Sequence, residues 1–125
     1  MPNLRFGDIV EAEILDPNGK NKKPRPVVVV TPDSEMTSAL SIAVVAISTL
    51  PPSGALPASY FELPAKLTVH GKGHPVTGLK AQCWAKCDWR CAIDKSDILY
   101  VRGCVPASIL KKIAVYLASL TTTSS

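Results

Sequence analysis

Alternation of apolar and polar residues predicts a strand near the start of the chain. In residues 7–15, Val10, Ala12 and Ile14 alternate with two glutamates, which is the period of a strand with one buried face. Asp-Pro-Asn-Gly follows at residues 16–19, and Asn and Gly both tolerate the positive φ angles of tight turns. The first predicted strand therefore ends in a turn.

Two nearly continuous apolar runs predict strands of a different kind. Residues 26–31 and 41–48 are mostly β-branched or otherwise apolar. Because no polar face alternates with the apolar one, we expect both strands to be buried on both faces. Shorter strands are predicted at residues 59–63, 81–88 and 97–102, with loops at 51–54 and 70–78. The second loop holds three glycines and a proline, and we expect it to be mobile.

Helical periodicity appears at the C-terminal end of the chain. Pro106 suits the first turn of a helix, where its missing N–H costs nothing. Apolar residues then recur at three- and four-residue steps and form one face: Ile109, Leu110, Ile113, Leu117 and Leu120. Lys111 and Lys112 lie on the opposite side. We expect one domain over residues 1–120, mainly β with a C-terminal helix, as a small antiparallel barrel or curled sheet, followed by a polar tail at 121–125.

Length and composition agree with a single folded domain. The chain has 125 residues, of which 46% are hydrophobic and 19% charged, as in globular proteins. No apolar run approaches the roughly 20 residues of a membrane-spanning helix, and the N-terminus lacks the apolar segment of a secretory signal. We therefore expect a cytoplasmic protein without a membrane partner.

Charge is distributed unevenly, although the net charge is only +4. Six of the ten acidic residues lie within the first 35 positions, and none lies between positions 63 and 87. That acid-free segment contains Lys66, His70, Lys72, His74, Lys80 and Lys86. A second basic segment occupies residues 20–25. Together they could line one phosphate-binding face; the alternative is that they are solvated loop charges.

Four cysteines raise the question of a metal site. Cys83, Cys87 and Cys91 are spaced four apart, after a pair of histidines at 70 and 74. On a strand, residues four apart face the same way but lie about 13 Å apart, at about 3.3 Å per residue, whereas structural zinc sites use tighter knuckles. We expect reduced thiols in small core positions, no metal and no cofactor; a zinc-stabilised interaction module is the competing hypothesis.

The order and spacing of several short segments resemble the MazF/PemK toxin family over about residues 6–120. Each segment alone is a weak signal, but their order is specific. They are Gly-Asp-Ile-Val at 7–10, the turn at 16–19, Arg-Pro-Val-Val-Val-Val at 25–30, Ala-Ile-Ser-Thr at 46–49, Thr-Gly-Leu at 77–79, Lys-Cys-Asp at 86–88 and Ala-Ile-Asp-Lys-Ser at 92–96.

The resemblance implies an SH3-like barrel that forms a homodimer, binds single-stranded RNA in a groove and is neutralised by an antitoxin peptide. It further implies an endoribonuclease that needs no metal, in which the 2′-hydroxyl of the substrate attacks the neighbouring phosphate. The products would carry a 2′,3′-cyclic phosphate and a free 5′-hydroxyl.

Four residues that match the family pattern suit this chemistry. Arg25 would stabilise the phosphorane oxygens, because its guanidinium keeps its charge and can contact two oxygens. Ser48, where the family usually has threonine, would donate to a phosphate oxygen or instead cap a turn. Asp88 would accept the 2′-hydroxyl proton, and Lys86, two residues away and on the same strand face, would assist the leaving oxygen; the alternative is a surface ion pair.

RNA contacts are expected from neighbouring basic, hydroxyl and aromatic residues: Lys20, Lys23, Thr49, Lys80, Trp84 and Arg90. Regular strand alternation places Trp84 on the face of Lys86 and Trp89 on the other, so Trp84 is the expected base-stacking ring.

The chain also departs from the family pattern. A histidine found after the first turn in some members is missing, Cys91 replaces an arginine, and Trp89 occupies a usually polar position. A catalytically silent module of the same fold, binding RNA or a peptide, is therefore the main alternative.

Overall fold

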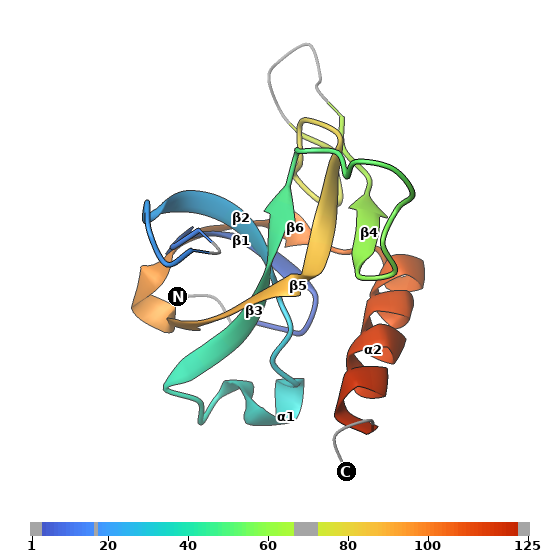
Figure 1. Cartoon of the computed structure of the whole chain (residues 1–125). Coiled ribbons are helices and arrows are strands. Elements are labelled where there is room, and N and C mark those ends of the chain that lie inside the picture. The colour runs from blue at the N-terminus through green and yellow to red at the C-terminus, as the bar shows by residue number, and fades with distance from the viewer. Residues whose placement is uncertain (1–3, 17, 67–72, 123–125) are drawn as a thin grey trace.

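The computed structural model describes residues 4–16, 18–66 and 73–122 (Figure 1). Its elements are β1 (Asp8–Ile14), β2 (Lys23–Val29), α1 (Asp33–Met36), β3 (Ser41–Ser48), β4 (Tyr60–Leu63), β5 (Cys83–Asp94), the 3₁₀ turn η1 (Lys95–Asp97), β6 (Ile98–Cys104) and α2 (Ala107–Thr122). The mainly β fold with a C-terminal helix is as predicted. None of the helices in the described residues is long and apolar enough to cross a membrane.

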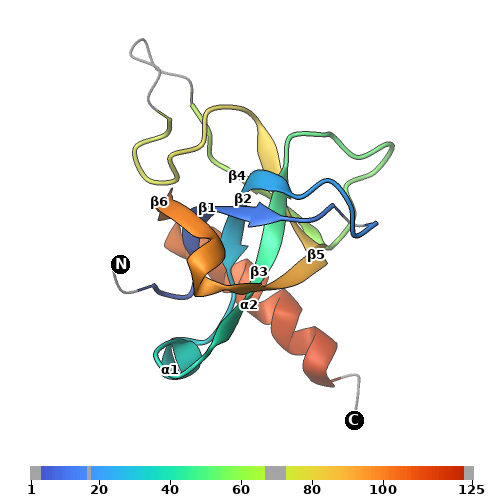
Figure 2. The ribbon, with the colours of Figure 1, turned by 90° about the vertical axis from the view of Figure 1, so that its left-hand side faces the viewer.

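The six strands form one antiparallel sheet in the order β4-β5-β3-β2-β1-β6. The sheet curls into a half-barrel, and α2 runs along its outer side (Figure 1). When the molecule is turned by 90°, the strands curl in front of α2 (Figure 2). The sheet therefore has an inner face enclosed by the curl and an outer face that α2 covers.

Both faces are packed, which is why the valine run of β2 is apolar throughout. Val27 and Val29 belong to an inner core with Met36 of α1, whereas Val28 belongs to an outer core with Ile113 of α2. All four residues of the run 27–30 are buried. The expected burial of β2 and β3 on both faces is confirmed.

Helix α2 docks through the predicted apolar face. Ile113 is fully buried in the outer core, and Ile109, Leu110 and Leu117 pack against that core. The rings of Phe61 and Tyr116 meet edge to face, with their centroids 5.8 Å apart. Leu120 at the end of the helix stays 39% exposed, so the docking face is shorter than the periodicity predicted.

Two strands differ from their predicted bounds for physical reasons. β2 begins at Lys23 and includes two prolines, but its ladder with β3 starts only at Val27, so the missing proline N–H groups interrupt no ladder on that side. β5 extends to Asp94 because it pairs with β3 across an irregularity that interrupts the alternation of its side chains. α1 and η1, each of four residues or fewer, carry no periodicity that a sequence pattern could reveal.

The described part of the predicted mobile loop is a hydrogen-bonded turn packed on β6. The Gly78 N–H donates to the His74 carbonyl at 2.8 Å, and the buried Thr77 hydroxyl donates to the Pro64 carbonyl at 2.6 Å. Gly78 has a φ of +72°, and a Cβ there would lie 2.4 Å from the Arg102 carbonyl oxygen, so both constraints require glycine. The expectation of mobility therefore does not describe residues 73–78, while residues 70–72 lie outside the described residues.

Replacing Ile113 with alanine should lower the free energy of unfolding by about 2–5 kcal/mol, because the deletion leaves a cavity between α2 and the sheet. Val115 lies on the solvent-facing side of the same helix and is 64% exposed. Val115→Ala should therefore change the free energy of unfolding by less than about 0.5 kcal/mol. Urea unfolding followed by circular dichroism measures both values. Equal effects of the two substitutions would contradict the packing of α2 described above.

Candidate functional site

Arg25 lies where the sheet opens. It stands between two prolines in the part of β2 that pairs with β1 but not with β3. The ladder between β2 and β3 begins with Val27 opposite Ala46. Continuing that antiparallel register by two residues on each strand brings Arg25 level with Ser48, and period-two alternation puts both on the inner face with Val27 and Ala46. Arg25 is half-buried.

A bulge in β5 redirects the residues that follow Lys86. Lys86 pairs with Ala46, but the next residue back on β3, Val45, pairs with Arg90. Three extra residues of β5 (Cys87, Asp88 and Trp89) therefore stand opposite a single step of β3. Because three is odd, the bulge reverses which residues face inward, and Trp89 packs against the inner core.

The bulge brings cations and aromatic rings together in a cation–aromatic cluster made of Arg25, Tyr60, Lys86 and Trp89. The Arg25 guanidinium carbon lies 5.3 Å from the centroid of the Trp89 ring. The Lys86 ammonium lies 5.6 Å from the same ring and 5.1 Å from the ring of Tyr60, its pairing partner on β4. All three distances are within the range of cation–π attraction.

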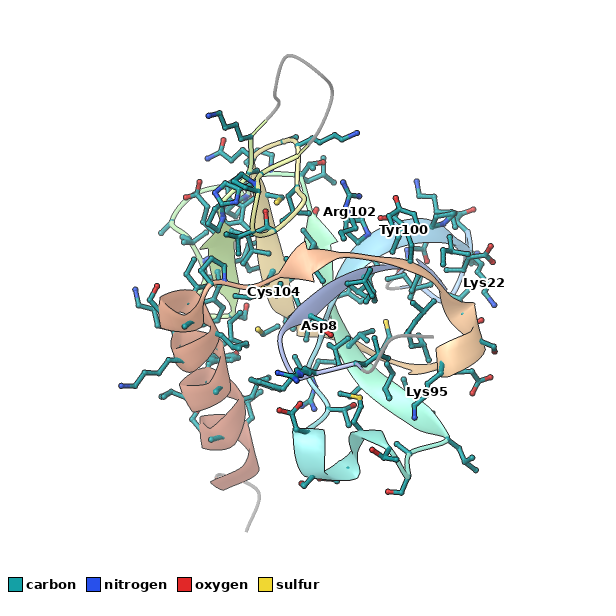
Figure 3. The ribbon with its side chains drawn as sticks, turned by 180° about the vertical axis from the view of Figure 1, so that it is seen from behind. Asp8, Lys22, Lys95, Tyr100, Arg102 and Cys104 are labelled. Carbon is teal, nitrogen blue, oxygen red and sulfur yellow. The ribbon has the colours of Figure 1, made fainter. Side chains whose placement is uncertain are left out.

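Neither of these two cations forms an ion pair among the described residues, although Asp16 lies near enough to attract Arg25 electrostatically. The ion pairs there join Lys22 to Asp97 at 3.6 Å and Arg102 to Glu11 at 2.9 Å, and Figure 3 labels Lys22 and Arg102 on the face opposite to that of Figure 1. The Nε of Arg25 is buried and has no hydrogen-bond partner. A buried, unpaired donor on a permanent cation favours an anionic ligand that can accept its hydrogen bond.

A pocket of about 440 Å³ adjoins the cluster between β5 and the turn that links β1 to β2. Lys86, Asp88 and Trp89 contribute to its wall, together with Arg90, Cys91, Leu15, Asp16 and Gly19. Asp88 is exposed, so its carboxylate is open to solvent and to any ligand of the pocket. A hydrogen bond from the Lys20 N–H, aided by Asn21, Asn18 and the positive charge of Arg25, lowers the pKa of Asp16, so the turn carboxylate stays ionised to a lower pH.

The Ser48 hydroxyl has a structural contact of its own. Its Oγ accepts a hydrogen bond from the Leu50 N–H at 3.1 Å, which is the turn-capping arrangement that the sequence left open. Because Oγ acts as acceptor there, its own hydrogen is still available for donation. Ser48 is half-buried and pairs with Trp84 of β5.

Trp84 requires a correction. It was the expected stacking ring, but it is only 7% exposed and offers little surface to a base. Trp89, expected on the other face, is half-buried beside Arg25 and Lys86 instead. The reason is the bulge, which regular alternation cannot predict. Tyr60 was not singled out either, because its relevance depends on its pairing with Lys86 across the sheet.

The other predicted RNA contacts lie around the cluster rather than in it. Lys20 and Lys23 are exposed on the turn and at the start of β2. Thr49 and Lys80 line a separate pocket of about 240 Å³ next to Pro26. Arg90 is exposed and lines the pocket at the cluster as well as a groove beside α2. The structure thus brings Arg25, Lys86 and Trp89 into contact and arranges the remaining cations at the periphery.

The cysteines occupy three kinds of environment. Cys83 and Cys87 are buried in the outer core, and burial raises the pKa of each thiol to about 11, as expected for core thiols. Cys91 is half-buried and packs against the inner core, whereas Cys104, for which no core position was predicted, is exposed. No group of three or more potential ligands in the described residues is placed to hold a metal ion; His70 lies outside those residues.

Solved structures with the same fold include several toxins. The chain superposes with the Mycobacterium tuberculosis toxin MazF-mt6 at a TM-score of 0.66 and 20% identity, covering 90% of this chain and 93% of that one. It superposes with MazF from Deinococcus radiodurans at a TM-score of 0.68 and 18% identity, covering 98% and 99%. A mycobacterial endoribonuclease in complex with its cognate antitoxin gives a TM-score of 0.66 at 14% identity, covering 93% and 92%.

Sequence comparison identifies the family more directly. No curated protein sequence matches this chain. Residues 5–121, however, match the family described as PemK-like, MazF-like toxin of type II toxin-antitoxin system. This match extends over nearly the whole chain and includes every strand of the sheet and most of α2. The chain therefore belongs to the PemK-like, MazF-like toxins of type II toxin–antitoxin systems.

Proposed function

We propose that this protein is an endoribonuclease that cuts single-stranded RNA by attack of the 2′-hydroxyl on the adjacent phosphate. The observation that carries the proposal is the pair of cations, Arg25 and Lys86, held against Trp89 beside a pocket, with no carboxylate in ion-pair contact with either among the described residues. A phosphodiester is the anion that such a site suits. Family membership supports the same activity, and two of the similar solved structures are described as endoribonucleases.

Each step of the reaction has a candidate group in this site. Arg25 would contact the non-bridging oxygens, whose negative charge grows in the phosphorane. The Ser48 hydroxyl would donate to one of those oxygens. Asp88 would accept the proton from the attacking 2′-hydroxyl, and Lys86 would donate a proton to the departing 5′-oxygen. The P–O5′ bond breaks as the P–O2′ bond forms, giving a 2′,3′-cyclic phosphate and a 5′-hydroxyl, and the step requires no metal.

The rest of the substrate would follow the peripheral cations. Arg90 lines the pocket at the cluster, Lys20 and Lys23 are exposed on the turn after β1 and at the start of β2, and Thr49 with Lys80 would hold another phosphate in the smaller pocket near Pro26. Such contacts position a strand without reading its sequence. They would make binding weaken as the salt concentration rises.

A silent module that binds RNA without cutting it is the second candidate. Two departures from the family pattern favour it: the missing histidine after the first turn and Cys91 in the place of an arginine. Both hypotheses predict RNA binding through Arg25. They differ only in whether RNA is cleaved.

The proposed partners follow from the family and from the surface. Solved toxins of this fold occur with their antitoxins, and we propose that an antitoxin peptide neutralises this protein in the cytoplasm.

We also propose a homodimer. β6 is an edge strand on which Leu99, Tyr100 and Val101 are 50%, 55% and 40% exposed, and Figure 3 shows Tyr100 on this strand, which crosses the side turned toward the viewer. Exposed edges with apolar residues tend to pair with another chain.

Arg25→Ala should reduce the rate of RNA cleavage in EDTA by about 10²–10³-fold, because one charged donor to the transition state is lost. Arg25→Lys should recover only part of that loss, since lysine lacks the guanidinium fork. Gel analysis of mixed-sequence RNA measures the rates, with Lys111→Ala on the exposed side of α2 as the matched control. RNA that is bound but stays intact with the unaltered protein would instead identify the silent module.

A substrate with a single 2′-deoxy nucleotide at the cleaved position should resist cleavage there and remain cleavable elsewhere. The reason is that the attacking oxygen belongs to the RNA and not to the protein. Mass spectrometry of the fragments measures the outcome, and wild-type products should carry a cyclic phosphate. Cleavage at the 2′-deoxy position would exclude the internal-nucleophile mechanism.

Tyr100→Lys should convert a dimer into a monomer, because a charge on the β6 edge would be buried without a partner. Val115→Lys, on the exposed side of α2, tests the helix as the alternative interface. Sedimentation velocity reports the mass of each variant. A dimer that survives Tyr100→Lys but dissociates with Val115→Lys would move the interface from β6 to α2.

A further inference from the structure

Cations in proteins are commonly positioned by carboxylates, and this site uses aromatic rings instead. Arg25 and Lys86 lie 5.3 Å and 5.6 Å from the centroid of one indole, that of Trp89, and Lys86 lies 5.1 Å from the ring of Tyr60. Neither cation belongs to an ion pair among the described residues. The rings are therefore the groups that the structure provides to orient both charges.

This difference matters for binding an anion. A carboxylate that holds a guanidinium occupies its N–H donors and cancels its charge, so an incoming phosphate must displace it. A ring face attracts the cation through its quadrupole, leaves the N–H donors free and carries no net charge. The Nε of Arg25 is buried and has no hydrogen-bond partner. This agrees with an arrangement in which the N–H donors of the guanidinium are available to a ligand.

The position of Trp89 depends on the bulge in β5. Without the three extra residues opposite one step of β3, alternation would turn the side chain at position 89 away from Arg25 and Lys86. The irregular pairing of β5 therefore coincides with the residue whose ring contacts both cations. Such departures often re-aim a side chain beside a functional site.

We propose that Trp89 is a positioning residue that orients Arg25 and Lys86 toward a phosphodiester of the substrate, with Tyr60 supporting Lys86 from the neighbouring strand. This inference rests on the proposed function and deepens it. Trp89 acts through the two cations rather than through a base of the substrate. A ring at this position is therefore required, whereas its indole N–H is not.

The test compares ring-retaining and ring-removing substitutions at the same positions. Trp89→Leu should lower kcat for RNA cleavage about tenfold, whereas Trp89→Phe should lower it less than about threefold. Tyr60→Leu and Tyr60→Phe form a second matched pair with the same order. KM should rise less than kcat falls, because the cations contact the phosphate in the ground state but act most strongly on the charge of the transition state. Thermal unfolding of each variant shows whether the fold is retained.

The decisive readout is the double mutant. In the Arg25→Ala background, Trp89→Leu should have a markedly smaller effect than in the unaltered protein, because part of what the ring positions is already gone. Full additivity, with the loss appearing in KM, would overturn the inference and show that Trp89 contacts a base. Equal losses for Trp89→Phe and Trp89→Leu would overturn it as well.

A binding assay separates failure of this inference from failure of the proposed function. The probe is a short DNA oligonucleotide of mixed sequence, which cannot undergo 2′-hydroxyl attack. Trp89→Leu and Arg25→Ala should each weaken its binding, and Trp89→Leu should weaken it less in the Arg25→Ala background than in the unaltered protein. If RNA is not cleaved but this pattern appears, the positioning role stands and the nuclease activity does not. Unchanged DNA affinity in Trp89→Leu would overturn the positioning role.

Discussion

Two cations held against one indole ring, with no ion pair to either among the described residues, are the constraint around which this site is built. Arg25 and Lys86 approach one indole ring from different strands of the sheet. Each is half-buried and gains cation–π attraction from the ring. A bound phosphodiester would supply a negative charge in direct contact with both cations, so the arrangement favours an anionic ligand.

The fold meets this constraint with two local irregularities in an otherwise regular sheet. The prolines beside Arg25 delay the pairing of β2 with β3, which leaves the guanidinium at an opening of the sheet. The bulge in β5 supplies Trp89 from the facing strand. The core behind them is rigid, since β2 and β3 are packed on both faces and α2 closes the outer one. Precise placement of charged groups depends on such a support.

Much of the fold could be predicted from the sequence because its signals are local. The valine run of β2 indicated burial on both faces, and the apolar repeat from Ile109 to Leu117 indicated a docked helix. Arg25, Lys86 and Asp88 could be proposed from their resemblance to family motifs. Trp89 and Tyr60 could not, because the first depends on a bulge that reverses alternation and the second on the register between β4 and β5. Neither the bulge nor the register between β4 and β5 produces a recognisable pattern of residues along the chain.

The most direct test of the central claim is a crystal structure of the protein with an RNA oligonucleotide that carries one 2′-deoxy nucleotide at the cleaved position. The phosphate 3′ to that nucleotide should accept hydrogen bonds from the guanidinium of Arg25, with Lys86 near the 5′-oxygen and both cations still against the ring of Trp89. A phosphate bound away from Arg25, or an Arg25 side chain that pairs with a carboxylate once RNA is bound, would contradict it.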